Sequence, residues 1–183
     1  LFMGCVSMSQ RFFADGKITR EAMNRAVLAG RIELHPVSRM FHAGHWQTAV
    51  GSSGTIKAIE SVVLAHGWSA DGISKSSLKK LRRALVKAGS IDKVRLDGLS
   101  DDRRPVFAGG LAVLSAVFKA LNIKHMQVSD LALREGLLYE MVGHIRHVDV
   151  RDSTVQALMQ RFGVDKKQAR RVEGTANSLL QQV

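Results

Sequence analysis

The chain has 183 residues, of which 45% are hydrophobic and 23% are charged, and only 2 are prolines. This composition indicates a globular chain rich in regular structure and excludes a collagen-like, low-complexity or disordered chain. Lys and Arg number 27 against 16 Asp and Glu, so the net charge of +11 gives the surface a positive potential that suits a polyanionic partner.

Cys5 is the only cysteine, which excludes an internal disulfide and a cysteine-based zinc site and indicates a reducing compartment. The longest apolar stretch, residues 106–121, includes Lys119 and is shorter than the roughly 18 to 20 apolar residues of a membrane-spanning helix. We therefore expect a cytoplasmic protein without a transmembrane segment, and peripheral attachment to the inner face of a membrane is left open. Because the chain opens on Leu1 without a basic leader, we interpret it as a fragment of a longer protein.

The first predicted elements are a strand, a helix and a second strand. Residues 1–9 are apolar and carry no helix cap, which predicts a buried strand. Apolar residues then recur at helical spacing after Thr19, the expected N-cap, and predict a helix of about four turns that ends before Pro36. Residues 46–50 predict a short strand that runs into Gly51.

Two further helices follow along the chain. Residues 56–66 predict the first, and Ser74 or Ser77 is expected to cap the second. The second has an apolar face and a basic face, formed by Leu78, Leu81 and Leu85 and by Lys79, Lys80, Arg82, Arg83 and Lys87 respectively. We interpret the basic face as a solvated surface, and a surface that guides anions is the alternative.

The rest of the chain is predicted to form one more helix and one more strand, followed by helices alone. Residues 110–121 predict a long apolar helix, and residues 125–128 predict a short strand. The alternation of short strands and helices indicates an α/β layer architecture. After Gly143, apolar residues recur only at helical spacing, which predicts a separate helical unit.

The first candidate site is a glycine–serine bend between a predicted strand and a predicted helix, made of Gly51, Ser52, Ser53, Gly54 and Thr55. Unpaired backbone N–H groups and the helix dipole favour an anion at such a position. Two glycines let the backbone curl around the anion, and three hydroxyls add donors. The bend therefore predicts a phosphate-binding loop, and a serine-capped turn without a ligand is the alternative. It lacks the lysine of a Walker loop and the spacing of a dinucleotide-binding glycine motif.

The second candidate combines Arg103 with a glycine pair, Gly109 and Gly110, which we expect to open a helix. The planar fork of an arginine binds two phosphate oxygens at once, which suits a chain of phosphates. The alternative is a surface ion pair between Arg103 and a neighbouring aspartate, which contributes at most about 1 kcal/mol.

The third candidate lies after the strand predicted over residues 125–128. Ligands of open α/β sheets collect at the carboxyl ends of strands, and Ser129 or Asp130 is expected there to cap a helix that carries Arg134 and Glu135. A plain helix cap followed by a surface ion pair explains the same residues equally well.

The seven histidines show no spacing typical of metal ligands, and no catalytic Ser-His-Asp order is visible. Their only local concentration is His144 and His147 with Asp149, which we interpret as part of a solvated linker. We therefore expect no metal site and no catalytic residue built from these side chains.

Three blocks, taken together, resemble the exopolyphosphatase and guanosine pentaphosphate phosphohydrolase family. They are the bend that starts at Gly51, the pair Asp102-Arg103 with the stretch from Val106 through the glycine pair, and residues 128–139. Residues 3–6 and 11–13 also match the family, as do residues 146–151 and 168–172, and these last two segments favour the exopolyphosphatase branch. Two positions depart from the family pattern: Leu131, where a small residue is common, and Ala108, where proline is common.

The resemblance implies an α/β, ribonuclease-H-like fold of the actin-like ATPase superfamily. Residues 1–141 would be most of its second lobe, and residues 142–183 the first helices of a helical, HD-like third domain. The implied reaction is hydrolysis of terminal phosphoanhydride bonds of inorganic polyphosphate with Mg²⁺, in a homodimer, and guanosine pentaphosphate is the alternative substrate.

The resemblance also implies how the candidate residues divide their roles. The bend, Arg103 and the glycine pair Gly109 and Gly110 would bind phosphate, and Ser129, Arg134 and Glu135 would shape the cleft. The family's carboxylate base and metal ligands have no counterpart in this sequence. We therefore expect that this chain alone binds polyphosphate weakly and hydrolyses nothing.

Other classes of function remain open. The charge would suit the phosphates of a nucleic acid, but an aromatic content of 5% and the absence of a recognition motif argue against that partner. A sugar or acetate kinase on the same scaffold is a further alternative, and so is a lobe whose exposed apolar surface binds a protein partner.

Overall fold

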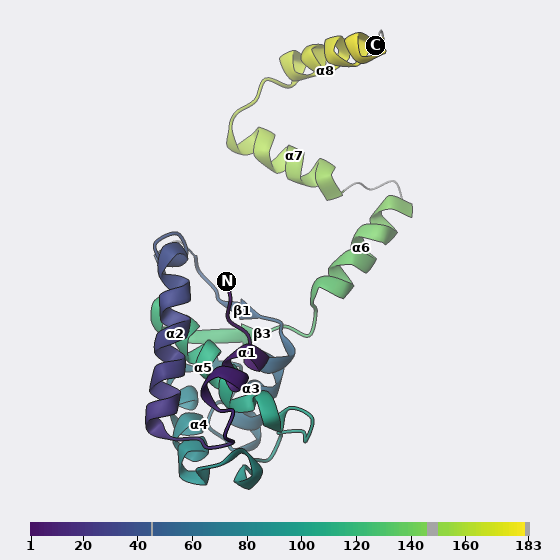
Figure 1. Ribbon diagram of the computed structural model, residues 1–183. Helices are drawn as coiled ribbons and strands as arrows, with labels where there is room; N and C mark the ends of the chain where they lie inside the picture. The colour runs from purple at the N-terminus through teal and green to yellow at the C-terminus, as the bar shows by residue number, and fades with distance from the viewer. Residues whose placement is uncertain (45, 146–149, 182–183) are drawn as a thin grey trace. The chain divides into compact units, whose positions relative to one another are not determined.

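The computed structural model describes residues 1–44, 46–145 and 150–181 of the chain (Figure 1). These residues belong to two compact units, Leu1–Ala132 and Leu133–Val183. None of the described helices combines the length and the apolar composition needed to cross a bilayer.

The first unit packs helices around a small sheet. Its helices are α1 (Cys5–Phe12), α2 (Arg20–Ser38), α3 (Gly54–Ala65), α4 (Lys75–Ala88) and α5 (Arg104–Ala120), with the 3₁₀ turn η1 (Ile91–Lys93). Its strands are β1 (Val50–Gly51), β2 (Ile73–Ser74) and β3 (His125–Val128). They lie in the order β1-β3-β2, and β3 pairs parallel with β1 and antiparallel with β2. The predicted α/β architecture is therefore confirmed.

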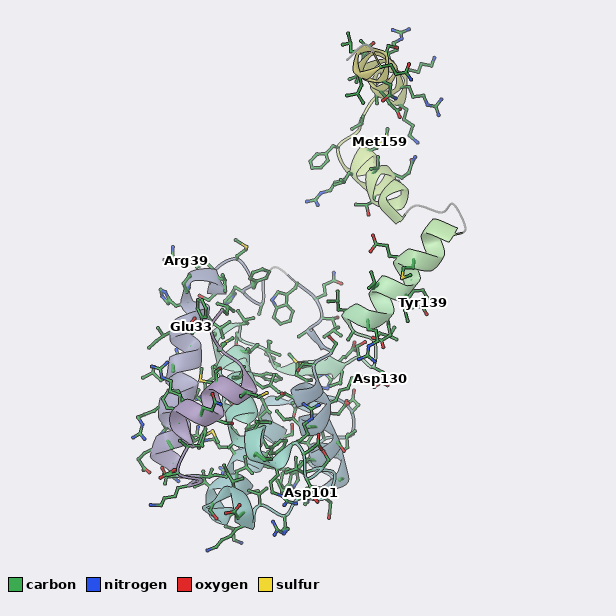
Figure 2. All side chains as sticks on the ribbon, turned by 45° about the vertical axis from the view of Figure 1, so that its right-hand side comes forward. Glu33, Arg39, Asp101, Asp130, Tyr139 and Met159 are labelled. Atoms are coloured by element: carbon green, nitrogen blue, oxygen red, sulfur yellow. The ribbon has the colours of Figure 1, made fainter. Side chains whose placement is uncertain are left out.

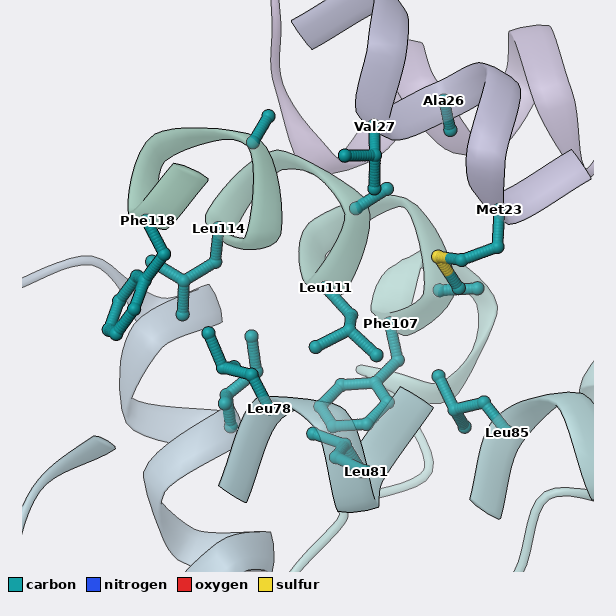
Figure 3. Close-up of a cluster of buried hydrophobic side chains, with 14 of the residues drawn as sticks. Met23, Ala26, Val27, Leu78, Leu81, Leu85, Phe107, Leu111, Leu114 and Phe118 are labelled. Atoms are coloured by element: carbon teal, nitrogen blue, oxygen red, sulfur yellow. The ribbon is translucent and has the colours of Figure 1, made fainter. Parts of the chain in front are cut away.

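Helix α5 is the centre of the hydrophobic core. Figure 3 shows Phe107, Leu111, Leu114 and Phe118 of α5 between side chains of α2 and side chains of α4. The contributing residues of the other two helices are Met23, Ala26, Val27, Leu78, Leu81 and Leu85. All of these side chains are buried, and burial of an aliphatic or aromatic side chain stabilises the fold by roughly 1.5–3 kcal/mol each.

Serine and threonine caps fix where helices α2 and α4 begin. Thr19 accepts a hydrogen bond from the backbone N–H of Ala22 and starts α2, as predicted. Ser74 and Ser77 form a reciprocal pair of cap hydrogen bonds at the start of α4, so Ser74 is the N-cap. Each cap satisfies an N–H group that the helix itself leaves without an acceptor.

The strand predicted at the N-terminus is wrong, because residues 5–12 form helix α1. Met8 and Ser9 are buried, whereas Val6 and Ser7 are exposed, so a single face of the helix packs inward. A short apolar run has too few residues to distinguish the helical period from a buried strand.

Helix α2 is longer than predicted, and the strand before Gly51 is shorter. Pro36 lies inside α2, which continues to Ser38. The proline is exposed and sits in the last turn, where the lost backbone hydrogen bond can be replaced by water. The strand predicted over residues 46–50 is reduced to Val50–Gly51, and the Trp46 indole donates a hydrogen bond to the Phe41 carbonyl (2.8 Å).

Helix α5 begins at Arg104, six residues earlier than predicted. Pro105 lies in its first turn, a position that suits proline because no N–H donor is needed there. The expectation that the glycine pair opens the helix is therefore wrong: Gly109 and Gly110 are buried in its interior.

The described part of the second unit is helical, as predicted for this region. It contains α6 (Leu133–Ile145), α7 (Val150–Arg161) and α8 (Lys166–Leu180), which carry Tyr139 on α6 and Met159 on α7 (Figure 2). Asp165 caps α8 by accepting hydrogen bonds from the N–H groups of Lys167 and Gln168. Residues 146–149, which were matched to the family by resemblance and include His147 and Asp149, lie outside the described residues.

Candidate functional site

The glycine–serine bend joins the end of β1 to the first turn of α3. Gly51 is buried in the sheet, and its carbonyl accepts a hydrogen bond from the N–H of Ser129 (2.8 Å). Ser52, Ser53 and Gly54 are exposed. The sheet thus fixes one end of the bend, and the other end presents its polar groups to solvent.

The exposed part of the bend is a set of hydrogen-bond donors. Ser53 is the N-cap of α3, and its hydroxyl oxygen accepts a hydrogen bond from the N–H of Ile56 (3.2 Å). The N–H groups of Gly54 and Thr55 belong to the first turn and have no acceptor within the helix. The positive end of the helix dipole and these N–H groups favour an anion at this point.

Arg103 lies directly against the bend. A β-carbon built on Gly54 would be 3.0 Å from Nη2 and 3.1 Å from Nη1 of Arg103, so the guanidinium occupies the space beside the glycine. The side chain of Arg103 is 44% exposed, and its Nε lies 3.4 Å from a carboxylate oxygen of Asp102. The structure thus brings together two of the candidates found in the sequence, a loop with free amides and an arginine fork.

Two aspartates position the two arginines at the start of α5. Asp101 pairs with Arg104, and Asp102 pairs with Arg103. A side-chain hydrogen bond from Ser100 and, secondarily, the charge of Arg103 hold the pKa of Asp102 below its usual value. A carboxylate with a lowered pKa is a weak base, so Asp102 orients the guanidinium and is poorly suited to accept a proton.

A second cation lies on α3, close to the end of β3. The Nζ of Lys57 donates a hydrogen bond to the backbone oxygen of Asp130 (2.9 Å) and lies 3.5 Å from its carboxylate. Asp101 and Asp130 are both at the surface of the first unit (Figure 2). Sequence reasoning missed Lys57, although it is the only cation within α3 and follows the Ser53 cap by one turn.

The remaining candidate residues have local structural roles. The hydroxyl of Ser129 accepts a hydrogen bond from the N–H of Leu131 and donates one to its carbonyl, so Ser129 closes a turn after β3. The helix expected at Ser129 or Asp130 begins at Leu133 instead. Arg134 and Glu135 lie in the first turn of α6 and belong to the second unit, so their cleft-shaping role stays a prediction.

Gly109 and Gly110 are close-packing positions. A β-carbon on Gly109 would meet the backbone of α1 at Cys5 O (2.5 Å) and Ser9 N (2.6 Å), and one on Gly110 would collide with the methyl group of Thr55. Their N–H groups lie inside α5, where the helix itself supplies acceptors. The glycine pair therefore allows α5 to approach α1 and the first turn of α3, and it offers no open helix start to a phosphate.

No group of three or more His, Cys, Asp or Glu side chains in the described part of the chain could hold a metal ion. The Mg²⁺ implied by the family resemblance stays a prediction. What the bend and Arg103 can do is bind an anion through backbone amides, hydroxyls and a guanidinium, which is the donor set that phosphoryl oxygens prefer.

A family model described as the Ppx/GppA phosphatase family matches residues 1–145, and a second, described as Ppx/GppA phosphatase, domain III, matches residues 150–183.

Two curated relatives are named guanosine-5'-triphosphate,3'-diphosphate pyrophosphatase. The protein of Aeromonas hydrophila subsp. hydrophila is 36% identical over 183 residues, and the protein of Photobacterium profundum is 37% identical over 180 residues. The alignments cover 100% and 98% of this chain but only 37% and 36% of the relatives, so the chain spans little more than a third of their length.

Two solved structures of the Ppx/GppA phosphatase of Aquifex aeolicus share the fold. One, the type II variant, is 23% identical with a TM-score of 0.62 and covers 75% of this chain and 47% of that chain. The other is 22% identical with a TM-score of 0.62 and covers 78% of this chain and 47% of that chain. Together with the small sheet and its helices, this likeness confirms the α/β, ribonuclease-H-like fold expected from the sequence.

Proposed function

Since the chain belongs to the Ppx/GppA phosphatase family, we propose that it supplies the phosphate-binding wall of an enzyme that hydrolyses the terminal phosphoanhydride of guanosine pentaphosphate. The observation that carries this proposal is the contact between Arg103 and Gly54, because it combines a guanidinium fork with the open N-terminus of α3. The names of the curated relatives favour the guanosine polyphosphate over inorganic polyphosphate, the substrate preferred from the sequence.

In the proposed reaction, the oxygen of a water molecule bonds to the terminal phosphorus while the bond from that phosphorus to the bridging oxygen breaks. Negative charge grows on the bridging oxygen, and the proton of the attacking water leaves to a base. The N–H groups of Gly54 and Thr55 and the guanidinium of Arg103 would stabilise the charge on the phosphoryl oxygens. The hydroxyls of Ser52 and Ser53 would add uncharged donors.

We expect binding without turnover from this chain alone. Two carboxylates beside cations of the candidate site are engaged: Asp102 pairs with Arg103, and Asp130 pairs with Lys57. Asp102 is not poised as a general base, since such a base needs a pKa near the working pH and the pKa of Asp102 is lowered. A malachite-green assay of phosphate release from guanosine pentaphosphate tests this point, and release above the buffer rate would contradict it.

Calorimetric titration tests the substrate. If guanosine pentaphosphate is the ligand of the bend, a K79Q/R83Q variant, which lacks two cations that lie outside the bend, should bind it more tightly than inorganic tripolyphosphate, which carries linked phosphates but no nucleoside. Equal or tighter binding of tripolyphosphate would contradict the guanosine polyphosphate proposal.

Inorganic polyphosphate is the second candidate substrate, and the net charge of +11 favours it. In that case affinity should rise steadily with the length of the polyphosphate chain. Homodimerisation of the full enzyme and a cytoplasmic location, with or without peripheral membrane attachment, stay predictions.

A further inference from the structure

A basic hollow lies between the first residue of α2 and one face of α4, and its lining includes neither the bend nor Arg103. It has a volume of about 450 Å³, within the range of small-molecule sites. We name it the α2–α4 groove and define it by its lining residues, Arg20, Lys79, Arg82, Arg83, Val86 and Lys87.

The groove is lined almost entirely by cationic side chains. Three of the lining residues are arginines and two are lysines, and Val86 is the single apolar residue. Arginine forks bind phosphate oxygens in pairs, which favours phosphoryl groups over single carboxylates. The lining contains no aromatic side chain, so a nucleobase would find nothing on which to stack.

These cations have no acidic partners among the residues that the structure describes. The ion pairs recorded there involve Lys57, Arg103, Arg104 and His125 and none of the cations of the groove. Arg82 is held in place by a neutral group instead, because its Nη2 donates a hydrogen bond to the side-chain oxygen of Asn24 on α2 (2.7 Å). This contact links the two helices and orients one guanidinium at the groove.

The cations also crowd one another. Burial and, after it, the charge of Arg20 lower the pKa of Arg82. Lys119, at the end of α5, has its pKa lowered by burial and then by four neighbouring cations, Arg82, Arg31, Lys75 and Lys79. Like charges held this close repel, and a multivalent anion between them would relieve the repulsion.

We infer that the α2–α4 groove is a second binding site, for a short chain of linked phosphoryl groups that it holds without hydrolysing. The size of the groove, its arginines and its lack of carboxylates and aromatics suit a compact oligophosphate. The phosphates could come from inorganic oligophosphate or from the phosphate end of a nucleotide. The groove shares no residue with the bend, so this inference stands whether or not the bend binds a substrate.

The probe for the test is inorganic tripolyphosphate, added to the full chain with isotope-labelled valine methyl groups. Val86 lines the groove, whose lining does not include Arg103, so its methyl signals report binding at the groove. We expect saturable shifts of the Val86 signals, and the same shifts with ATP if the phosphates of a nucleotide suffice.

The variant K79Q/R83Q removes two cations of the groove, and K80Q/K93Q removes the same charge from exposed positions that do not line it. The first should weaken the binding followed at Val86 by about tenfold or more, and the second by less than about twofold. Equal losses in the two variants would mean general charge attraction and would overturn the inference.

Two further outcomes also overturn it. One is the absence of any Val86 shift with tripolyphosphate. The other is displacement of tripolyphosphate by an equal phosphate concentration of oligothymidylate, which would assign the groove to nucleic acid. Circular dichroism of each variant checks that it is folded.

Discussion

The guanidinium of Arg103 fills the space that a side chain at position 54 would need. Both terminal nitrogens lie 3.0–3.1 Å from the point where a β-carbon on Gly54 would be, which is closer than carbon and nitrogen normally approach. Gly54 is the first residue of α3, and its φ angle requires no glycine. Because Gly54 has no side chain, the guanidinium of Arg103 can lie beside the first N–H groups of the helix.

We predict that Gly54→Ala displaces Arg103 and weakens phosphate binding without unfolding the protein. The atoms that must move are the end of a flexible, half-exposed side chain, so the free energy of unfolding should change by less than about 1 kcal/mol. Affinity for guanosine pentaphosphate should fall about three- to tenfold in calorimetric titration. The titration is made in the K79Q/R83Q background, which keeps the α2–α4 groove from contributing.

The control for this change is Gly44→Ala, where nothing lies within 4 Å of the added methyl group. It should leave the affinity unchanged. An undiminished affinity in Gly54→Ala would mean that the contact between the guanidinium and the bend has no part in binding.

Substitution of Arg103 itself separates charge from geometry. Arg103→Gln should lower the affinity for guanosine pentaphosphate by about tenfold, and Arg103→Lys should have an intermediate effect, since lysine keeps the charge but loses the fork. Arg25→Gln removes an exposed charge of α2 and serves as the control. If Arg103→Gln and Arg25→Gln lose affinity equally while Arg103→Lys binds like the unchanged protein, Arg103 acts only through the net charge of the protein.

Local signals in the sequence predicted those features that neighbouring residues determine. Thr19 caps its helix as predicted, Ser74 is one of the two caps expected for α4, and β3 spans the four residues expected of it. The bend was found because glycine and serine mark the start of a helix whichever way the rest of the chain packs. Arg103 was selected for its chemistry, and its position beside Gly54 became visible only in three dimensions.

The glycine pair of α5 could not be predicted, because its cause lies in other helices. Glycine usually marks turns and helix ends, so Gly109 and Gly110 were interpreted as a helix start. In the structure they are the small residues that let α1 and α3 approach α5, a tertiary requirement that no local pattern contains. Lys57 was missed for a related reason, since its partner Asp130 is 73 residues away in the sequence.

The two glycines should respond differently to alanine. Gly109→Ala meets the backbone of Cys5 and Ser9, which cannot rotate away, and should destabilise the protein by about 1–3 kcal/mol. Gly110→Ala meets the methyl group of Thr55, so it should displace the first turn of α3 and weaken phosphate binding as well.

Thermal unfolding and calorimetric titration of both variants measure these effects. Gly136→Ala is the matched control, because it lies within α6 and nothing is within 4 Å of the added methyl group. If Gly109→Ala is as stable as this control, the close approach of α1 to α5 is not required for folding.

Substitution of the two serines of the bend distinguishes an effect on thermal stability from an effect on phosphate affinity. Ser53→Ala removes the N-cap of α3 and should cost about 1 kcal/mol, a fall in Tm of about 2–4 °C. Ser52 has no side-chain hydrogen bond among the described residues, so Ser52→Ala should leave the Tm unchanged and reduce only the affinity for guanosine pentaphosphate. A fall in Tm for Ser52→Ala would show that its hydroxyl has a structural role.

Glu60 on α3 predicts a pH dependence of stability. Burial, followed by the charges of Asp130 and Asp71, raises the pKa of Glu60, and a hydrogen bond with the Gly72 backbone partly opposes the rise. The folded protein therefore binds this proton more tightly than the unfolded chain. The stability it contributes is fully present below the ordinary glutamate pKa of about 4.3 and is lost as the pH rises through the raised value.

Glu60→Gln removes this dependence and keeps an oxygen for the Gly72 hydrogen bond. The free energy of unfolding, measured in urea between about pH 4 and pH 7, should therefore rise for Glu60→Gln relative to the unchanged protein as the pH increases. Asp97→Asn, which neutralises an exposed carboxylate elsewhere, should not reproduce the trend. A stability difference between Glu60→Gln and the unchanged protein that stays constant with pH would contradict the raised pKa, because a group whose proton affinity is the same in the folded and unfolded chain makes no pH-dependent contribution.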